Sequence, residues 1–112
     1  MNCLFCKIVN GEIPSSKVYE DDMILSFYDI NPEAKIHVLV IPKLHIDSAD
    51  AVDENNSKCV THIFEKIPYI AKLAGITNGY RVITNAGADA CQSVNHLHFH
   101  ILGGEKLPEH II

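Results

Sequence analysis

The strictest constraint on the fold is a short alternating stretch near the carboxyl end, His-Leu-His-Phe-His-Ile at residues 96–101. Successive side chains of a β-strand point to opposite faces, so this alternation predicts a strand over residues 95–102. Leu97, Phe99 and Ile101 would face the core, and the three imidazoles would line the other face, about 7 Å apart. Such a row can bind a metal together with a further ligand, or it can supply a nucleophile whose neighbours donate hydrogen bonds to an anion.

The rest of the chain supplies partners for that strand. A helical pattern over residues 3–11 ends in Asn10-Gly11, a common helix C-cap. Further strands are predicted over residues 16–21, 23–30, 37–42 and 79–85, and a long amphipathic helix from about residue 53 to a cap at Gly75. Sequential strands joined by short turns favour an antiparallel sheet with the helix on one face. We therefore expect an α+β fold.

Composition limits the partners that this chain can have. Its 112 residues carry a formal net charge of -5, whereas a nucleic-acid binder needs clustered Lys and Arg, so we expect no nucleic-acid partner. No apolar run approaches the ~20 residues that cross a bilayer, and the amino terminus lacks a leader pattern. We therefore expect no membrane association and a cytoplasmic location.

The connection before the histidine strand has the composition of an anion-binding loop. Residues 86–94 are rich in small residues that leave backbone N–H groups accessible. Asn85, Gln92 and Ser93 add polar side chains at its two ends. Phosphate is the anion that such a loop suits best.

Residues 92–104, QSVNHLHFHILGG, resemble the signature of the histidine triad superfamily. Residues 4–22, 26–46 and 79–87 are similar to further segments of the family in the same order. The branch that the chain resembles most is the histidine triad nucleotide-binding proteins, which hydrolyse nucleoside phosphoramidates. This resemblance implies a single domain over residues 1–112, with a five-stranded antiparallel sheet, one long helix and a short N-terminal helix. It also implies a homodimer.

The resemblance further implies a purine nucleotide ligand of the AMP or GMP type. Base and ribose would be held by residues from the first half of the chain, with a carboxylate that accepts from the ribose hydroxyls. The phosphate would be held by the loop and the triad. The implied nucleotide-binding residues are Phe5, Ile8, Phe27, Asp29, Ile30, Asn85, Gln92, Ser93, His98 and His100.

The chemistry implied by the resemblance centres on His98 as the nucleophile. A neutral imidazole has one nitrogen lone pair, which can attack the α-phosphorus and give a nucleotidyl-histidine intermediate that water then cleaves. His100 would donate to the phosphate oxygens, and Ser93 would help to protonate the leaving nitrogen. His96 completes the implied catalytic set, and no catalytic metal is required.

Cys3 and Cys6 form a CxxC pair, which in a reducing compartment indicates metal binding or redox chemistry; two ordinary reduced cysteines are the alternative. Two thiolates two residues apart, with histidines from distant strands, can complete a tetrahedral zinc site. In the zinc-bearing members of the family that the chain resembles, the matching histidines are His45 and His96. We therefore expect a structural zinc on Cys3, Cys6, His45 and His96.

The chain departs from the family pattern in the phosphate loop. Ala90 and Cys91 stand where relatives usually have a glycine pair, and a Cβ is strained wherever the backbone needs a positive φ. Asn95 replaces an aromatic residue, so the leaving-group preference stays open. Three other functions remain: a dinucleoside polyphosphate hydrolase or nucleotidyl transferase, a non-catalytic nucleotide-binding scaffold, and a metallohydrolase with the triad as zinc ligands.

Overall fold

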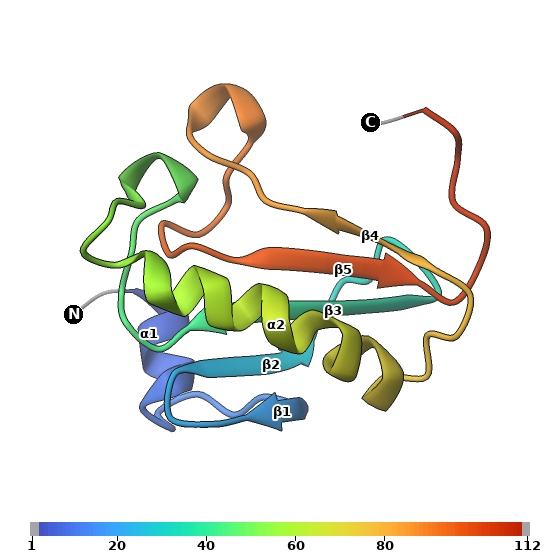
Figure 1. Cartoon of the computed structure of the whole chain (residues 1–112), viewed down its shortest axis with the longest axis horizontal. Coiled ribbons are helices and arrows are strands. Elements are labelled where there is room, and N and C mark those ends of the chain that lie inside the picture. The colour runs from blue at the N-terminus through green and yellow to red at the C-terminus, as the bar shows by residue number, and fades with distance from the viewer. Residues whose placement is uncertain (1–2, 111–112) are drawn as a thin grey trace.

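Five strands form one antiparallel sheet in the order β1-β2-β3-β5-β4, in a computed structural model that describes residues 3–110 (Figure 1). A long helix and a short N-terminal helix complete the predicted α+β fold, which is confirmed. The elements are α1 (Leu4–Val9), β1 (Lys17–Glu20), β2 (Ile24–Tyr28), β3 (Ile36–Pro42), η1 (Ala49–Ala51), α2 (Ser57–Leu73), β4 (Tyr80–Ile83), η2 (Ala88–Ala90) and β5 (Phe99–Gly103). None of the helices in residues 3–110 is long and apolar enough to cross a membrane.

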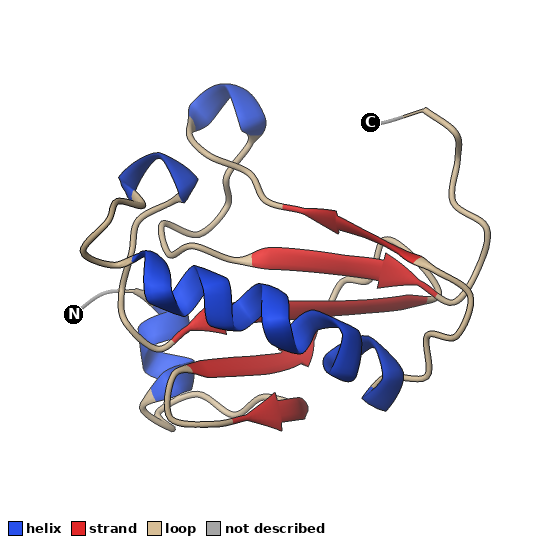
Figure 2. Cartoon of the chain, viewed as in Figure 1, coloured by secondary structure: helices blue, strands red, loops and turns tan. Residues whose placement is uncertain are grey.

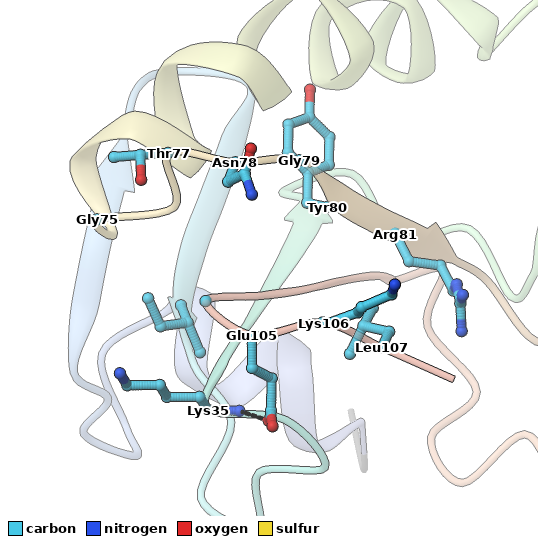
Figure 3. A pocket seen from close by; sticks show the side chains of 12 residues that line it. Lys35, Gly75, Thr77, Asn78, Gly79, Tyr80, Arg81, Glu105, Lys106 and Leu107 are labelled. Atoms are coloured by element: carbon cyan, nitrogen blue, oxygen red, sulfur yellow. Dashed lines mark hydrogen bonds between the residues drawn. The ribbon is translucent and has the colours of Figure 1, made fainter. Parts of the chain in front are cut away.

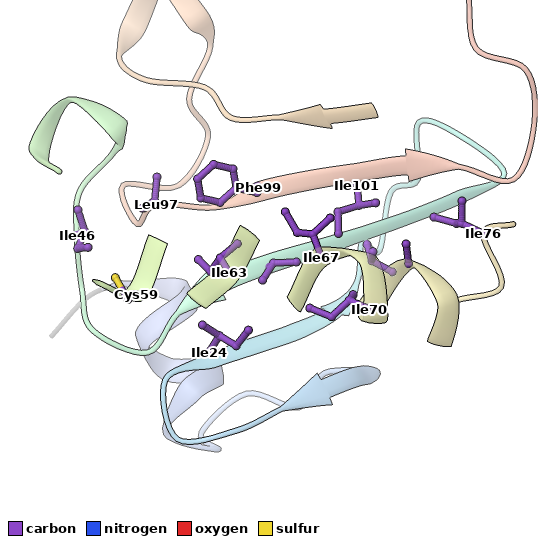
Figure 4. Packing of buried hydrophobic residues seen from close by; sticks show 13 residues of the cluster. Ile24, Ile46, Cys59, Ile63, Ile67, Ile70, Ile76, Leu97, Phe99 and Ile101 are labelled. Atoms are coloured by element: carbon purple, nitrogen blue, oxygen red, sulfur yellow. The ribbon is translucent and has the colours of Figure 1, made fainter. Parts of the chain in front are cut away.

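Helix α2 covers one face of the sheet and closes the larger of two hydrophobic clusters (Figure 4). Its buried residues Ile63, Ile67 and Ile70 recur at three- and four-residue spacing, as an amphipathic helix requires. They pack against the sheet side chains that include Phe99 and Ile101. The alternation of β5 therefore places its apolar residues under α2, as predicted, and leaves the other face of the sheet for the histidines.

Helix α1 covers part of that other face. Phe5 and Ile8 pack there against Leu25, Phe27, Leu39 and Ile41 of β2 and β3, so these two strands are buried on both sides. The helix ends as predicted, with Asn10 as its C-cap and Gly11 at φ 79°. A six-residue helix thus forms one wall beside the histidine segment.

Two predicted boundaries are wrong by about four residues, while the other element ends differ by at most two. The long helix begins at Ser57 rather than near residue 53, because the Asp53 carboxylate accepts from the N–H groups of Asn55 and Asn56 and closes a separate turn. The last strand begins at Phe99 rather than at residue 95, because the N–H of Leu97 donates to the carbonyl of Ile46 instead of joining the sheet. His96 and His98 therefore lie in the irregular connection between β4 and β5 (Figure 2).

Candidate active site and metal centre

A cavity of about 270 Å³ lies beside α1, on the face of the sheet opposite α2. All of the predicted nucleotide-binding residues line it except Asn85 and Gln92. The lining also includes residues that the sequence did not indicate. They are Leu4, Pro14, Ser15, Ser16, Tyr28, Asn31, Leu39 and Val94.

The His98 side chain has one fixed nitrogen and one that is free for chemistry. Its Nδ1 lies 2.7 Å from the carbonyl oxygen of His96, and because a carbonyl only accepts, Nδ1 carries the proton. In a neutral ring the lone pair then lies on Nε2. The ring is 3% exposed and meets the edge of Phe5, with ring centroids 5.1 Å apart. His98 therefore lines the cavity as an oriented imidazole.

A further histidine, His37, belongs to the site and was missed from the sequence. It lies on β3 and alternates with Leu39, so it shares the cavity face, but the surrounding apolar run conceals that alternation. The backbone N–H of Glu33 donates to its Nδ1 over 3.0 Å. The proton of a neutral His37 is consequently on Nε2, which lies 2.8 Å from Nδ1 of His100 and 3.4 Å from Oδ2 of Asp29.

This chain of contacts also sets the tautomer of His100. Nδ1 of His100 accepts from His37, so the proton of a neutral His100 is on Nε2. Burial, followed by the charges of His98 and His37, lowers the pKa of His100 to about 4. Burial lowers the pKa of His37 as well, against the opposing effect of Asp29. Both rings are therefore neutral near pH 7, and His100 presents an N–H donor.

The loop between β4 and β5 is braced by its own glutamine. Oε1 of Gln92 accepts from the N–H of Gly87 at 2.9 Å, and Nε2 donates to the carbonyls of Asp47 and Val94 at 2.7 and 2.9 Å. The amide is thus occupied within the protein, which explains why Gln92 is not part of the cavity lining. Ser93, the next residue, does line the cavity with His98 and His100.

Cys91 adopts the left-handed conformation, with φ 57° and ψ 41°. It is the one described non-glycine residue with a positive φ. The family resemblance raised this possibility, because it implies that a glycine is usual at this position. A Cβ in this conformation costs about 1 kcal/mol or more. Ala90 is accommodated in η2.

The predicted metal ligands Cys3, Cys6, His45 and His96 come together, and one donor atom of each lies within 4.8 Å of all the others. Nδ1 of His96 lies 3.4 Å from Sγ of Cys3 and 3.5 Å from Sγ of Cys6, and Nδ1 of His45 lies 3.3 Å from Sγ of Cys6. Zinc–sulfur and zinc–nitrogen bonds at the tetrahedral angle separate S and N by about 3.5 Å. The spacing of this cluster therefore fits zinc.

The hydrogen bonds behind these ligands fit a metal as well. Nε2 of His96 lies 2.8 Å from the carbonyl of Pro42, and Nε2 of His45 lies 2.8 Å from Oδ1 of Asp47. Each Nε2 therefore carries a proton, and each Nδ1 turns its lone pair to the sulfurs, as in proteins whose metal-bound histidines donate to an oxygen. Burial raises the pKa of the Cys6 thiol to about 11, with Cys3 adding to the rise. A cation is what would stabilise two thiolates here.

His96 is accordingly separated from the other two histidines. The sequence predicted one row of three rings, but His96 is fully buried and turned to the cysteines, while His98 and His100 line the cavity with ring centroids 5.1 Å apart. Asp29, His37 and His100 form a second group within metal-binding distance. The direct His37–His100 hydrogen bond already accounts for their proximity.

A larger hollow of about 760 Å³ lies where β3 and β4 begin and β5 ends (Figure 3). Lys35, Arg81 and Lys106 line it together with Glu105, which accepts from the N–H of Lys35. Its lining includes none of the described histidines or cysteines, so the chemistry described above lies elsewhere.

The family model for the HIT domain matches residues 10–107. HitA of Neisseria gonorrhoeae is 44% identical over 102 residues, which are 91% of this chain and 95% of HitA. The 14 kDa zinc-binding protein of Zea mays is 41% identical over 106 residues, 93% of this chain and 83% of that protein.

Solved structures agree with this match. A histidine triad protein from Clostridium difficile is 53% identical, with a TM-score of 0.93 over 98% of this chain and 96% of its own. A HIT family hydrolase from Clostridium thermocellum is 44% identical, with a TM-score of 0.95 over 99% of this chain and 97% of its own. These similarities therefore extend over nearly the whole chain.

Proposed function

This chain belongs to the HIT domain family, and on that premise we propose that it is a purine nucleotide-binding hydrolase that cleaves the P–N bond of nucleoside 5′-phosphoramidates. The observation that carries the proposal is the orientation of His98. Its Nδ1–H is held by the His96 carbonyl at 2.7 Å, so Nε2 keeps the lone pair that a nucleophile needs. The relative from Clostridium thermocellum is described as a hydrolase, which supports this class of reaction.

In the proposed first step, Nε2 of His98 attacks the α-phosphorus and forms a P–N bond. The bond from phosphorus to the leaving amine breaks, and the amine departs with a proton that Ser93 helps to deliver. The Nε2–H of His100 donates to a phosphate oxygen and stabilises the charge that builds there. In the second step, water attacks phosphorus and breaks its bond to His98, which releases the nucleoside monophosphate and restores the free lone pair. The proton that water loses replaces the one that left with the amine.

The nucleoside would lie between α1 and β2. Phe5 and Phe27 meet edge to face with ring centroids 5.7 Å apart, and with Ile8 and Ile30 they offer an apolar surface to a purine. Oδ1 of Asp29 already accepts from the N–H of Asn31 at 2.8 Å. This contact holds the carboxylate at the cavity, where it can accept hydrogen bonds from the ribose hydroxyls.

We also propose that Cys3, Cys6, His45 and His96 bind a structural zinc. When bound, zinc would fix α1 to the segment that carries the triad, and the catalytic steps above do not pass through it. The zinc-binding description of the Zea mays relative supports this proposal, as does the donor geometry. Protein purified without a polyhistidine tag is expected to contain about one zinc per chain, and Cys6→Ser to lose it. Cys91→Ser, which changes an exposed cysteine, is the control.

The reaction is tested by trapping the intermediate. Protein mixed with adenosine 5′-phosphoramidate and quenched in denaturant is expected to carry an adenylyl group by mass spectrometry, and His98→Ala to carry none. His110→Ala, which removes an exposed histidine outside the cavity, should match the unchanged protein. Full turnover by His98→Ala would refute the assignment.

Three parallel measurements separate this reaction from its alternatives. Faster cleavage of a diadenosine polyphosphate than of the phosphoramidate would favour a polyphosphate hydrolase or nucleotidyl transferase. AMP binding in calorimetry without any adduct or turnover would favour a non-catalytic scaffold. Turnover that persists after confirmed metal removal would exclude a metallohydrolase.

A further inference from the structure

We propose that Thr84 is a positioning residue for His98, a role that rests on the proposed function of His98 as the nucleophile. The Thr84 hydroxyl donates to the carbonyl oxygen of His98 over 2.7 Å. Thr84 directly follows β4, and His98 directly precedes β5. The hydrogen bond therefore joins the segment that follows β4 to the segment that precedes β5, at the point where the sheet ends and the site begins.

The Thr84 hydroxyl adds one hydrogen bond between these two segments beyond the last regular residue pair of β4 and β5. Residue pairing between β4 and β5 ends at Ile83 opposite His100. Past this point the two segments no longer pair with each other. The N–H of Leu97 donates instead to the carbonyl of Ile46 over 2.6 Å. A side-chain donor at position 84 thus fixes the His98 main chain where regular pairing no longer does.

His98 is thereby held at both its main chain and its ring. Thr84 holds the carbonyl, the His96 carbonyl holds Nδ1 at 2.7 Å, and Phe5 contacts the ring. The contacts of the ring fix its tautomer and tilt, and the contact of the main chain fixes the point from which the ring extends. Displacement of a reacting group by about 1 Å can reduce a rate by about 100-fold. Thr84 acts through the placement of Nε2 and does not line the cavity.

The test compares variants that keep or remove the hydroxyl. Thr84→Val preserves the shape of the side chain and is expected to slow adenylylation of His98 in a single turnover by about tenfold, with AMP affinity within about twofold of the unchanged protein. Thr84→Ser keeps the hydroxyl and is expected to retain the rate. Thr77→Val, an exposed threonine in the loop before β4, is the matched control.

The outcomes separate this inference from the proposed function. Adduct formation at the full rate by Thr84→Val overturns the positioning role and leaves the nucleophile assignment intact. Equal slowing by Thr84→Ser and Thr84→Val also overturns it, because the hydroxyl would then not be the cause. Absence of any adduct in the unchanged protein refutes the proposed function itself. If Thr84→Val does not fold, full activity of Thr84→Ser together with a slow rate for Thr84→Ala supports the role.

Discussion

At the scale of single residues, each of four histidines has one ring nitrogen committed to a neighbour within the protein. His96 and His98 donate to backbone carbonyls, His37 accepts from a backbone N–H, and His100 accepts from His37. In the proposed function, one ring type would therefore serve as metal ligand, nucleophile, relay and donor. The role of each ring follows from the nitrogen that its neighbour leaves free.

The contact between His37 and His100 gives a first prediction. His37→Phe removes the donor that fixes the tautomer of His100, so His100 can place its proton on Nδ1 and cease to donate to phosphate. We expect kcat to fall by about tenfold or more. Nitrogen NMR of the His100 ring should show a mixture of tautomers. An unchanged Nε2–H form in His37→Phe would contradict this account, and His110→Ala serves as the control.

The low pKa of His100 gives a second prediction. Its folded pKa of about 4 lies below the ~6.5 of an unfolded histidine, so between these values the unfolded chain binds more protons. This group therefore lowers the stability of the fold as pH falls from about 6.5 to about 4. Urea unfolding of the unchanged protein should show a steeper loss over that interval than His100→Gln. Direct NMR titration of His100 with a midpoint above pH 6 would contradict the prediction.

At the scale of elements, α1 serves two sites at once. Its Cys6 and the capping Cys3 belong to the cluster proposed to bind zinc, while Phe5 and Ile8 form a wall of the cavity. A helix of six residues has little stability of its own, so its position depends on what it contacts. The proposed metal binding and nucleotide binding would therefore act on the same short segment.

This shared helix predicts that zinc and nucleotide bind with positive coupling. Removal of zinc with a chelator should weaken AMP binding by about fivefold or more in calorimetry, and AMP should raise zinc affinity by the same factor. Cys6→Ser should reproduce the loss, and Cys91→Ser should not. Unchanged AMP affinity after confirmed zinc loss would show that α1 holds its place without the metal.

Local patterns predicted most elements, because the apolar spacing of β3 and α2 and the Asn10-Gly11 cap are properties of adjacent residues. The start of β5 could not be predicted in this way. The alternation of residues around His98 is the same whether or not a neighbouring strand pairs with this segment. The start of β5 depends instead on the distant carbonyl of Ile46, which accepts from the N–H of Leu97. The brace formed by Gln92 likewise depends on Asp47, 45 residues away in the chain.

At the scale of the whole molecule, the two edges of the sheet differ. Strand β1 carries the Lys17–Glu20 ion pair and an irregular register, features that discourage pairing with another chain. Strand β4 has one neighbour among the described strands (Figure 1). It carries Arg81 as its single charged residue. We therefore expect two copies to join through β4 and form a homodimer.

Sedimentation equilibrium is expected to give twice the chain mass of 12.4 kDa. Tyr80→Lys adds a charge to the β4 edge and should shift the protein toward the monomer. Tyr28→Lys is a matched control, since Tyr28 is equally exposed, at 41% against 40%, but ends the interior strand β2. A monomeric mass for the unchanged protein would contradict the expectation, as would equal dissociation of both variants.

The carbonyls that orient His96 and His98 have a consequence for how such a protein can diverge. A point mutation exchanges a side chain but leaves the main-chain oxygen in place, so substitution of Pro42 or of residue 96 itself does not delete either acceptor. His45, by contrast, depends on the side chain of Asp47. A descendant of this chain that loses its cysteines and His96 would still inherit the oxygen that holds the His98 ring, so the proposed metal centre could be lost in evolution before the proposed chemistry.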